Sequence, residues 1–294
     1  MQSEIAIGMA CLLMLIGLIV VSFLLAHWRR NRYRFSLRGL LLSFAVVGST
    51  LFLVLQFVRP KIVHWWAIRQ IYVSGGAVLF ESDNQRDAGD LYSDLTIANA
   101  VDDVFIVHIG NDREALAIAD QLRHVPEAKT LFLGRAVTDV GLTAVCNCGA
   151  HPSIEIVDFH SSQITEVGLV HLTKLPKLHT LFFNTCQLSD SDLKAFSRLP
   201  NVTSLTLLEE GPQANPGRFS NGGFEELGNA HNLESLVLVR LKISDRAAGC
   251  LHSLTNLKSL LIHRCHISDE AAAALRQALP RCKIKFTEPD AGWR

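Results

Sequence analysis

The chain has 294 residues, 49% of them hydrophobic, and a formal net charge of zero. This length suits a membrane segment followed by a repeat domain better than one small domain. The charge is unevenly distributed: residues 1–75 carry eight Arg or Lys and one acid, whereas residues 76–294 carry twenty Arg or Lys and twenty-seven acids. An acidic remainder argues against a nucleic-acid-binding surface, and seven irregularly spaced cysteines do not fit a small disulfide framework.

Two uncharged hydrophobic runs open the chain, at residues 5–26 and 39–58. As helices, runs of 22 and 20 residues are long enough to cross a bilayer core. A signal peptide fits less well, because no basic region precedes the first run and no small-residue cleavage site follows it. The loop 27–38 carries five arginines, which the positive-inside rule places in the cytoplasm. Residues 1–58 are therefore predicted to form two transmembrane helices in the cell membrane, with both termini extracytoplasmic.

Residues 59–102 connect these spans to the rest of the chain. A juxtamembrane helix is predicted over 59–74, because apolar residues recur there at helical spacing: Ile62, Trp65, Ile68 and Tyr72. Gly75 and Gly76 end it, and residues 77–80 fit a short strand. Residues 81–95 are polar and acidic, which indicates a linker; a calcium loop fits the spacing of its acids poorly.

Residues 103–286 repeat with a period of 24. Seven copies begin at residues 103, 127, 153, 177, 201, 232 and 256, and a capping strand follows at 282–286, before the tail 287–294. Each copy opens with apolar residues at offsets 1, 4 and 6, such as Leu178, Leu181 and Phe183. The last two alternate as a half-buried strand requires.

The second half of each copy predicts a short helix. A fourth apolar residue comes first and is usually followed by Ser or Thr and an acid, as at Ile164, Thr165 and Glu166. A hydroxyl cap with an acid in the first turn is a helix-start signal. Apolar residues at helical spacing come next, and Pro176, Pro200 and Pro280 end three of the helices.

This pattern resembles the leucine-rich repeats, and within them the cysteine-containing subclass related to ribonuclease inhibitor. The order of spans, linker and repeats is similar to membrane-anchored bacterial repeat proteins. The resemblance implies an α/β solenoid with a parallel sheet on its concave face and short helices on its convex face. It also implies a Cys or Asn that bonds backbone inside the turn; that position here holds Ala136, Ser162, Cys186, Leu241 and Cys265.

The concave face is the predicted binding surface. Its central column should contain His108, Phe132, Asp158, Phe182, Thr206, Val237 and Leu261. Apolar residues there are unusual for a solvated strand face, and exposed apolar patches often mark interfaces. We therefore expect a protein partner to contact Phe132, Asp158, His160, Phe182, Asn184, Val237, Leu261 and His263. The alternative is that the linker folds back over this stripe.

Other chemistry is weakly signalled. Asp158 and His160 alternate on one strand, as a base and its orienting acid could, but no nucleophile stands beside them. Cys146 and Cys148 with His151 lack a fourth zinc ligand. The insertion 209–217 fits a ligand-binding loop and a tolerated insertion equally well.

The sequence thus predicts a non-enzymatic, membrane-anchored repeat protein without metal or cofactor. Its expected contacts are the lipid bilayer and an unidentified protein, with no nucleic acid and no small-molecule substrate. A self-associating structural component of the envelope is the alternative, and a hydrolase-like enzyme using Asp158 and His160 is a distant one.

Overall fold

The structure is a computed structural model that describes residues 48–49, 52, 56, 59–79, 105–125, 128–147, 149, 153–210, 214–265 and 267–287. The chain divides into two compact units, Met1–Ala67 and Ile68–Arg294. Among the helices in these ranges, none is both long and apolar enough to cross a membrane. The two expected spans, 5–26 and 39–58, lie outside the described residues apart from Gly48, Ser49, Phe52 and Gln56.

The expected helix after the second run is present as α3 (Arg59–Val73). Its last turns bury Ile71 completely, whereas Ile68, on the face expected from the sequence, is half-buried. The short strand also forms, as β1 (Ala77–Leu79), and pairs antiparallel with the first strand of the repeats. The expected linker over residues 81–95 falls outside the described residues.

The repeats build one sheet. Its strands follow chain order from β1 to β9, and every pairing after the first is parallel. They are β2 (Phe105–Asn111), β3 (Ala128–Ala136), β4 (Ile156–His160), β5 (Thr180–Asn184), β6 (Ser204–Leu208), β7 (Ser235–Val239), β8 (Ser259–His263) and β9 (Lys283–Thr287). Chain order is expected when each copy contacts only its neighbours.

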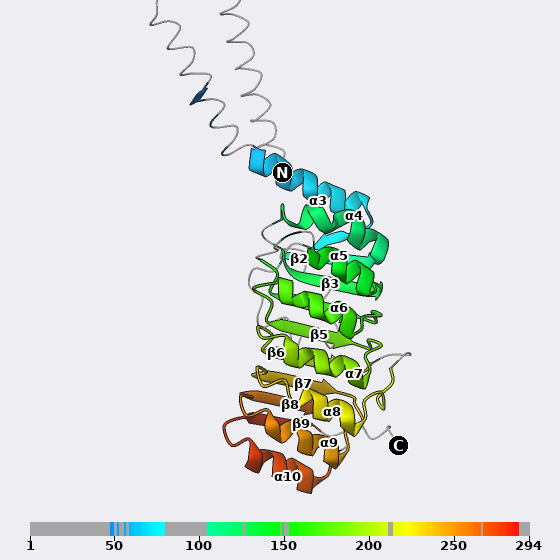
Figure 1. The fold of residues 1–294 in the computed structure, drawn as a ribbon, viewed down its shortest axis with the longest axis vertical. Coiled ribbons are helices and arrows are strands. Elements are labelled where there is room, and N and C mark those ends of the chain that lie inside the picture. The colour runs from blue at the N-terminus through cyan, green and yellow to red at the C-terminus, as the bar shows by residue number, and fades with distance from the viewer. Residues whose placement is uncertain are drawn as a thin grey trace, which may run out of the picture. The chain divides into compact units, whose positions relative to one another are not determined.

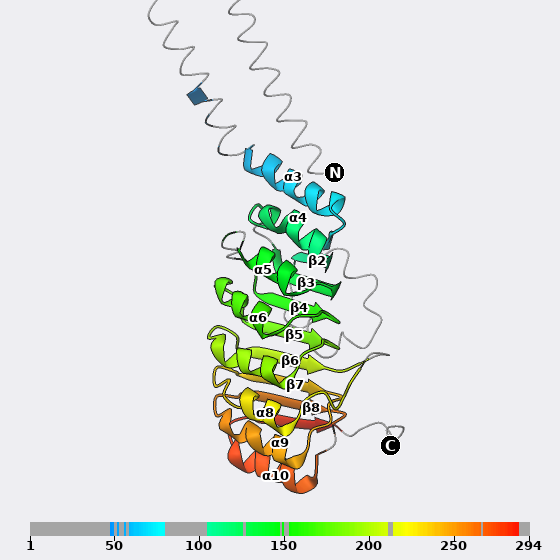
Figure 2. The ribbon, with the colours of Figure 1, turned by 45° about the vertical axis from the view of Figure 1, so that its right-hand side comes forward.

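Helices cover one face of this sheet, stacked in the same order as the strands (Figures 1 and 2). The α-helices are α4 (Asp112–Leu122), α5 (Asp139–Asn147), α6 (Glu166–Leu169), α7 (Asp190–Leu193), α8 (Asn221–Leu227), α9 (Asp245–Cys250) and α10 (Asp269–Ala278). Three of them continue as 3₁₀ turns: η3 (Val170–Lys174), η4 (Lys194–Arg198) and η5 (Leu251–Ser253). We call the face of the sheet without helices the concave face. The solenoid implied by the leucine-rich-repeat resemblance is thereby confirmed.

The core lies between sheet and helices. The described members of the offset 1, 4 and 6 triplets are at most 3% exposed, which confirms the strand register read from the sequence. The fourth apolar residue is also buried in most copies, although Ile267 is half-buried. Phe183 joins the two layers, because it stacks on Phe159 at 4.6 Å and meets Phe196 edge-on at 5.5 Å.

A left-handed residue ends four of the strands. Ser161, Thr185, Arg240 and Arg264 have φ between 52° and 55°. The next position is the cysteine position of the repeat. The Cys186 thiol donates to the carbonyl oxygen of Phe159 at 3.1 Å, inside the turn, as the resemblance implied. Burial raises the pKa of this thiol to about 11, so it stays protonated.

Neighbouring helices are linked by side chains at their N-terminal ends. The expected hydroxyl caps are confirmed at Thr138, Thr165, Ser244 and Ser268; Thr165, for example, accepts from the backbone N–H of Val167. At Ser189 the hydroxyl donates to Asp192 instead. The acid after each cap acts mainly on the next copy. Asp139 accepts from the N–H of Thr165 at 2.8 Å and from its hydroxyl at 2.6 Å. Asp112 makes the same two contacts with Thr138. We call this series of contacts between copies the acid ladder.

The acid ladder explains the glycine in the third position of several helices. A Cβ at Gly168 would lie 2.3 Å from Oδ1 of Asp139, and one at Gly223 would lie 2.2 Å from Oδ1 of Asp190. A side chain there would therefore displace the carboxylate. Where alanine takes the position, at Ala271, its N–H instead donates to Oγ of Ser268, the N-cap of its own helix, at 3.1 Å.

One junction is built differently. Helix α6 begins with Glu166, and the third position of α7 is Asp192, which is 5% exposed. Its carboxylate accepts from the N–H of Ser189 in its own helix, at 2.7 Å, and from the N–H of Glu166 in the preceding one, at 2.6 Å. The contact between copies is kept, but the acid reaches in the opposite direction.

Candidate functional site

The concave face presents its side chains in columns, because parallel strands in register place equivalent residues side by side. The central column has the membership expected from the sequence, extended by Lys285 on β9: His108, Phe132, Asp158, Phe182, Thr206, Val237, Leu261 and Lys285. A second column runs beside it and contains His160, Asn184, Leu208, Val239, His263 and Thr287. The candidate residues are therefore brought onto one surface.

The candidate residues are not uniformly exposed to solvent. Phe132, Phe182, Val237 and Leu261 are half-buried, since neighbours on strands about 4.7–4.9 Å away cover their flanks. His160 is exposed, whereas Asn184 is only 6% exposed. Asn184 therefore presents little surface to a partner, and its contact with one stays a prediction.

Three aromatic rings stack at one end of this face. The rings of His108 and Phe132 have centroids 4.7 Å apart and are inclined by 18°. The ring of His160 lies on the other side of Phe132, at 5.6 Å and 26°. Burial lowers the pKa of both imidazoles. The stack is therefore mostly uncharged at neutral pH and holds the Phe132 ring in place.

Asp158 lies between the two phenylalanines of the central column. It pairs laterally with Phe132 on β3 and with Phe182 on β5. Within the part of the chain that the structure describes, no hydrogen bond or ion pair reaches its carboxylate, and burial alone raises its pKa to about 7. Asp158 is half-buried, and carboxylates that lose part of their contact with water usually have a partner, so this one calls for explanation.

The Asp158–His160 pair needed for the hydrolase alternative does not form. Nδ1 of His160 accepts a hydrogen bond from the side-chain amide of Asn184 at 3.1 Å, and Asp158 makes no bond to the imidazole. The reason is geometric. Side chains two positions apart on a strand project in parallel from the same face and do not point at each other, whereas Asn184 reaches the imidazole from the adjacent strand. A base without its orienting acid offers no catalytic arrangement here.

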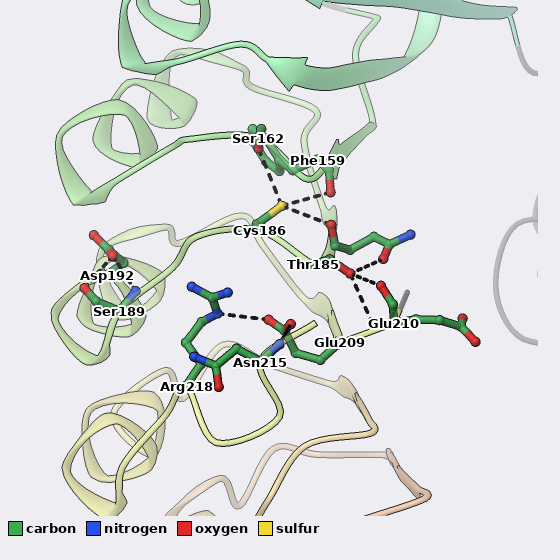
Figure 3. A network of polar contacts seen from close by, with 11 residues as sticks. Phe159, Ser162, Thr185, Cys186, Ser189, Asp192, Glu209, Glu210, Asn215 and Arg218 are labelled. Carbon is green, nitrogen blue, oxygen red and sulfur yellow. Dashed lines mark hydrogen bonds and ion pairs between the residues drawn. The ribbon is translucent and has the colours of Figure 1, made fainter. Parts of the chain in front are cut away.

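The insertion after β6 is held in place by a buried acid, which sequence reasoning missed. Glu209 is 3% exposed and accepts from the Asn215 N–H at 2.8 Å and from Arg218 Nε at 3.1 Å (Figure 3). Burial raises the pKa of Glu209, and the bonds from Asn215 and Arg218 oppose this. Glu210 adds an ion pair to Arg240 at 2.6 Å. The only signal in the sequence was the pair Glu209 and Glu210, which begins at the position where other copies have the left-handed residue.

The weaker metal motif gains no support. Cys146 is buried, and Cys148 and His151 fall outside the described residues. Over the ranges that the structure covers, no group of three His, Cys, Asp or Glu side chains could hold a metal ion.

Comparisons with known proteins are sparse at the sequence level. No protein-family model and no curated protein matches the chain. Among solved structures it is similar to an internalin from Listeria monocytogenes, with 14% identity and a TM-score of 0.35 over 64% of this chain and 59% of that one. It is also similar to a Bacteroides fragilis protein, with 17% identity and a TM-score of 0.38 over 60% of this chain and 61% of that one.

A leucine-rich-repeat protein from Leptospira interrogans is also similar, with 15% identity and a TM-score of 0.35 over 59% of this chain and 57% of that one. The chain thus spans about three-fifths of the length of these structures.

Proposed function

We propose that this protein binds another protein through the concave face of its repeats, and that its N-terminal runs anchor it in a membrane with the repeats on the extracytoplasmic side. The observation that supports binding is the group formed by Phe132, Asp158 and Phe182. Two half-buried aromatic rings flank a carboxylate that has no partner among the described residues. Aromatic anchors dominate the energetics of many interfaces.

Support for the anchor comes from the sequence. Two uncharged runs of 22 and 20 residues flank a loop with five arginines, and this combination is typical of a helical hairpin whose loop stays in the cytoplasm. The solenoid would then face the same compartment as both termini.

Binding is tested by capturing partners from the native membrane with the full-length chain. Phe182→Asp introduces a charge into the aromatic surface and should abolish capture while the circular dichroism spectrum is unchanged. Lys194→Glu changes an exposed residue of η4, on the helical face, and should leave capture intact. If Phe182→Asp combined with Phe132→Asp leaves capture unaltered, the concave face is not the binding site.

Orientation is tested with C-terminal reporters. Alkaline phosphatase fused after Arg294 should be active, because it folds only outside the cytoplasm, and a fluorescent protein that folds only inside should be dark. The reverse pattern would place the repeats in the cytosol.

A further inference from the structure

Asp158 is an acid of the concave face to which the described residues offer no hydrogen-bond donor and no counter-ion. The residue is half-buried, so its carboxylate loses part of its contact with water. By contrast, Asp139 accepts from Thr165, and Glu209 accepts from Arg218. Partial burial raises the pKa of the Asp158 carboxyl, and acids whose pKa is shifted in this way concentrate at functional sites.

Its immediate surroundings fit a cation. Phe132 and Phe182 are its lateral neighbours on the two adjacent strands, so both rings rise beside the carboxylate. Aromatic faces attract Lys and Arg side chains, and more strongly where water is displaced. The ring of Phe132 is already stacked with the imidazoles of His108 and His160, whose lowered pKa leaves them mostly neutral, so the ring of Phe182 is the one that can receive a cation.

A metal ion is a poor occupant. No group of three His, Cys, Asp or Glu side chains within the described ranges could hold one. The neighbouring amide of Asn184 is engaged by His160 and by the hydroxyl of Thr185, the latter at 3.0 Å. One carboxylate between hydrocarbon rings offers an ammonium or guanidinium group a counter-ion, but it leaves most ligand positions of a divalent ion empty.

The charge of the chain favours a different protein, and not another part of this chain, as the source of the basic group. Residues 81–104 contain seven acids and one arginine, so that segment carries the wrong sign to neutralise Asp158. A second copy of the solenoid is disfavoured for the same reason, since residues 76–294 have twenty-seven acids against twenty Arg or Lys. Charge complementarity therefore favours a basic segment of a different protein.

We infer that the concave face takes up a basic side chain of its protein partner, with arginine preferred, over the ring of Phe182 and with Asp158 as its counter-ion. Arginine fits better than lysine because its planar guanidinium stacks on aromatic rings and bonds a carboxylate through two N–H groups at once. The inference rests on the proposed function and names the chemical class of the partner at that site.

The test uses four immobilised pools of nonapeptides, randomised except for a central Arg, citrulline, Lys or Glu. Citrulline has nearly the shape of arginine without its charge. The full-length chain in detergent micelles should be retained about tenfold more by the Arg pool than by the citrulline pool, a factor typical of one charge-assisted hydrogen bond. Asp158→Asn should bring that ratio to near one.

A matched control removes an acid elsewhere. Asp120 on α4 is exposed and pairs with Arg123 at 2.8 Å, so Asp120→Asn changes the net charge equally and should keep the arginine preference. Circular dichroism melting verifies that both variants fold.

The outcomes separate the inference from the function on which it rests. If the wild-type chain is retained no more by Arg than by citrulline, or by neither, the inference is overturned. Should Phe182→Asp still lower retention on every pool in that case, binding at the concave face stands. An arginine preference that persists in Asp158→Asn also overturns the assignment of Asp158 as the counter-ion.

Discussion

Gly168→Ala is the sharpest test of the acid ladder. A Cβ at this position would lie 2.3 Å from Oδ1, 3.0 Å from Cγ and 3.2 Å from Cα of Asp139. The carboxylate would have to turn away and release the N–H and hydroxyl of Thr165, now bound at 2.8 and 2.6 Å. The helix α6 would lose an N-terminal anchor that comes from the preceding copy.

The magnitude follows from two opposed terms. Hydrogen bonds to a charged group contribute about 1.5–3 kcal/mol, and less at partly solvated sites such as this one. Alanine in place of glycine inside a helix returns about 1 kcal/mol. We therefore expect the free energy of unfolding to fall by about 1–2 kcal/mol, measured by urea denaturation followed by circular dichroism.

Two variants make the test decisive. Gly222→Ala is the matched control, since a Cβ there meets only Ser220 Oγ at 3.4 Å, and it should be neutral or stabilising. In an Asp139→Ala background the carboxylate is gone and only the 3.2 Å contact with the Cα of residue 139 remains, so Gly168→Ala should destabilise the fold much less than it does in the wild type. An equal loss in both backgrounds would refute the claim that this glycine accommodates the carboxylate.

Three further predictions concern burial. The pKa of Asp158 is raised from 3.8 to about 7, so the free energy of unfolding should fall as pH rises between these two values, by up to about 4 kcal/mol at pH 8. Denaturation measurements on Asp158→Asn should show no such fall. Identical pH dependence of both proteins would contradict the prediction. The Cys186 thiol, with a pKa of about 11, should resist iodoacetamide at pH 8 until urea is added, whereas half-exposed Cys250 reacts, as peptide mass spectrometry would show. Leu181→Ala should lower the free energy of unfolding by about 2–5 kcal/mol and Phe182→Ala by much less; similar losses would mean a wrong strand register.

The features read correctly from the sequence are those determined within one copy. Alternating apolar residues place Leu181 inward and Phe182 outward, and a hydroxyl before an acid starts a helix at Thr165. Both patterns are local, and their recurrence from copy to copy makes them hard to mistake. The column of candidate residues followed from the same register, because parallel strands in register bring equivalent positions together.

The features that were missed depend on contacts between copies. Asp139 and Thr165 are 26 residues apart, and nothing inside either copy indicates that one binds the other. The burial of Asn184 was missed because a neighbouring histidine engages its amide. A column assigned from periodicity says which side chains share a face, but exposure depends on how each one packs against the next strand.

The acid ladder also limits how such an array could grow by tandem duplication. A repeated copy 232–255 would set Asp245 against Ala247, the same combination that Asp245 and Ala271 already form at the next junction, where Asp245 bonds to Ser268. A repeated copy 177–200 would set Asp190 against Asp192, and both carboxylates would compete for the N–H and hydroxyl of a single Ser189. Copies that are alike in period are therefore not interchangeable, and duplication is easier at one end of the solenoid than in its middle.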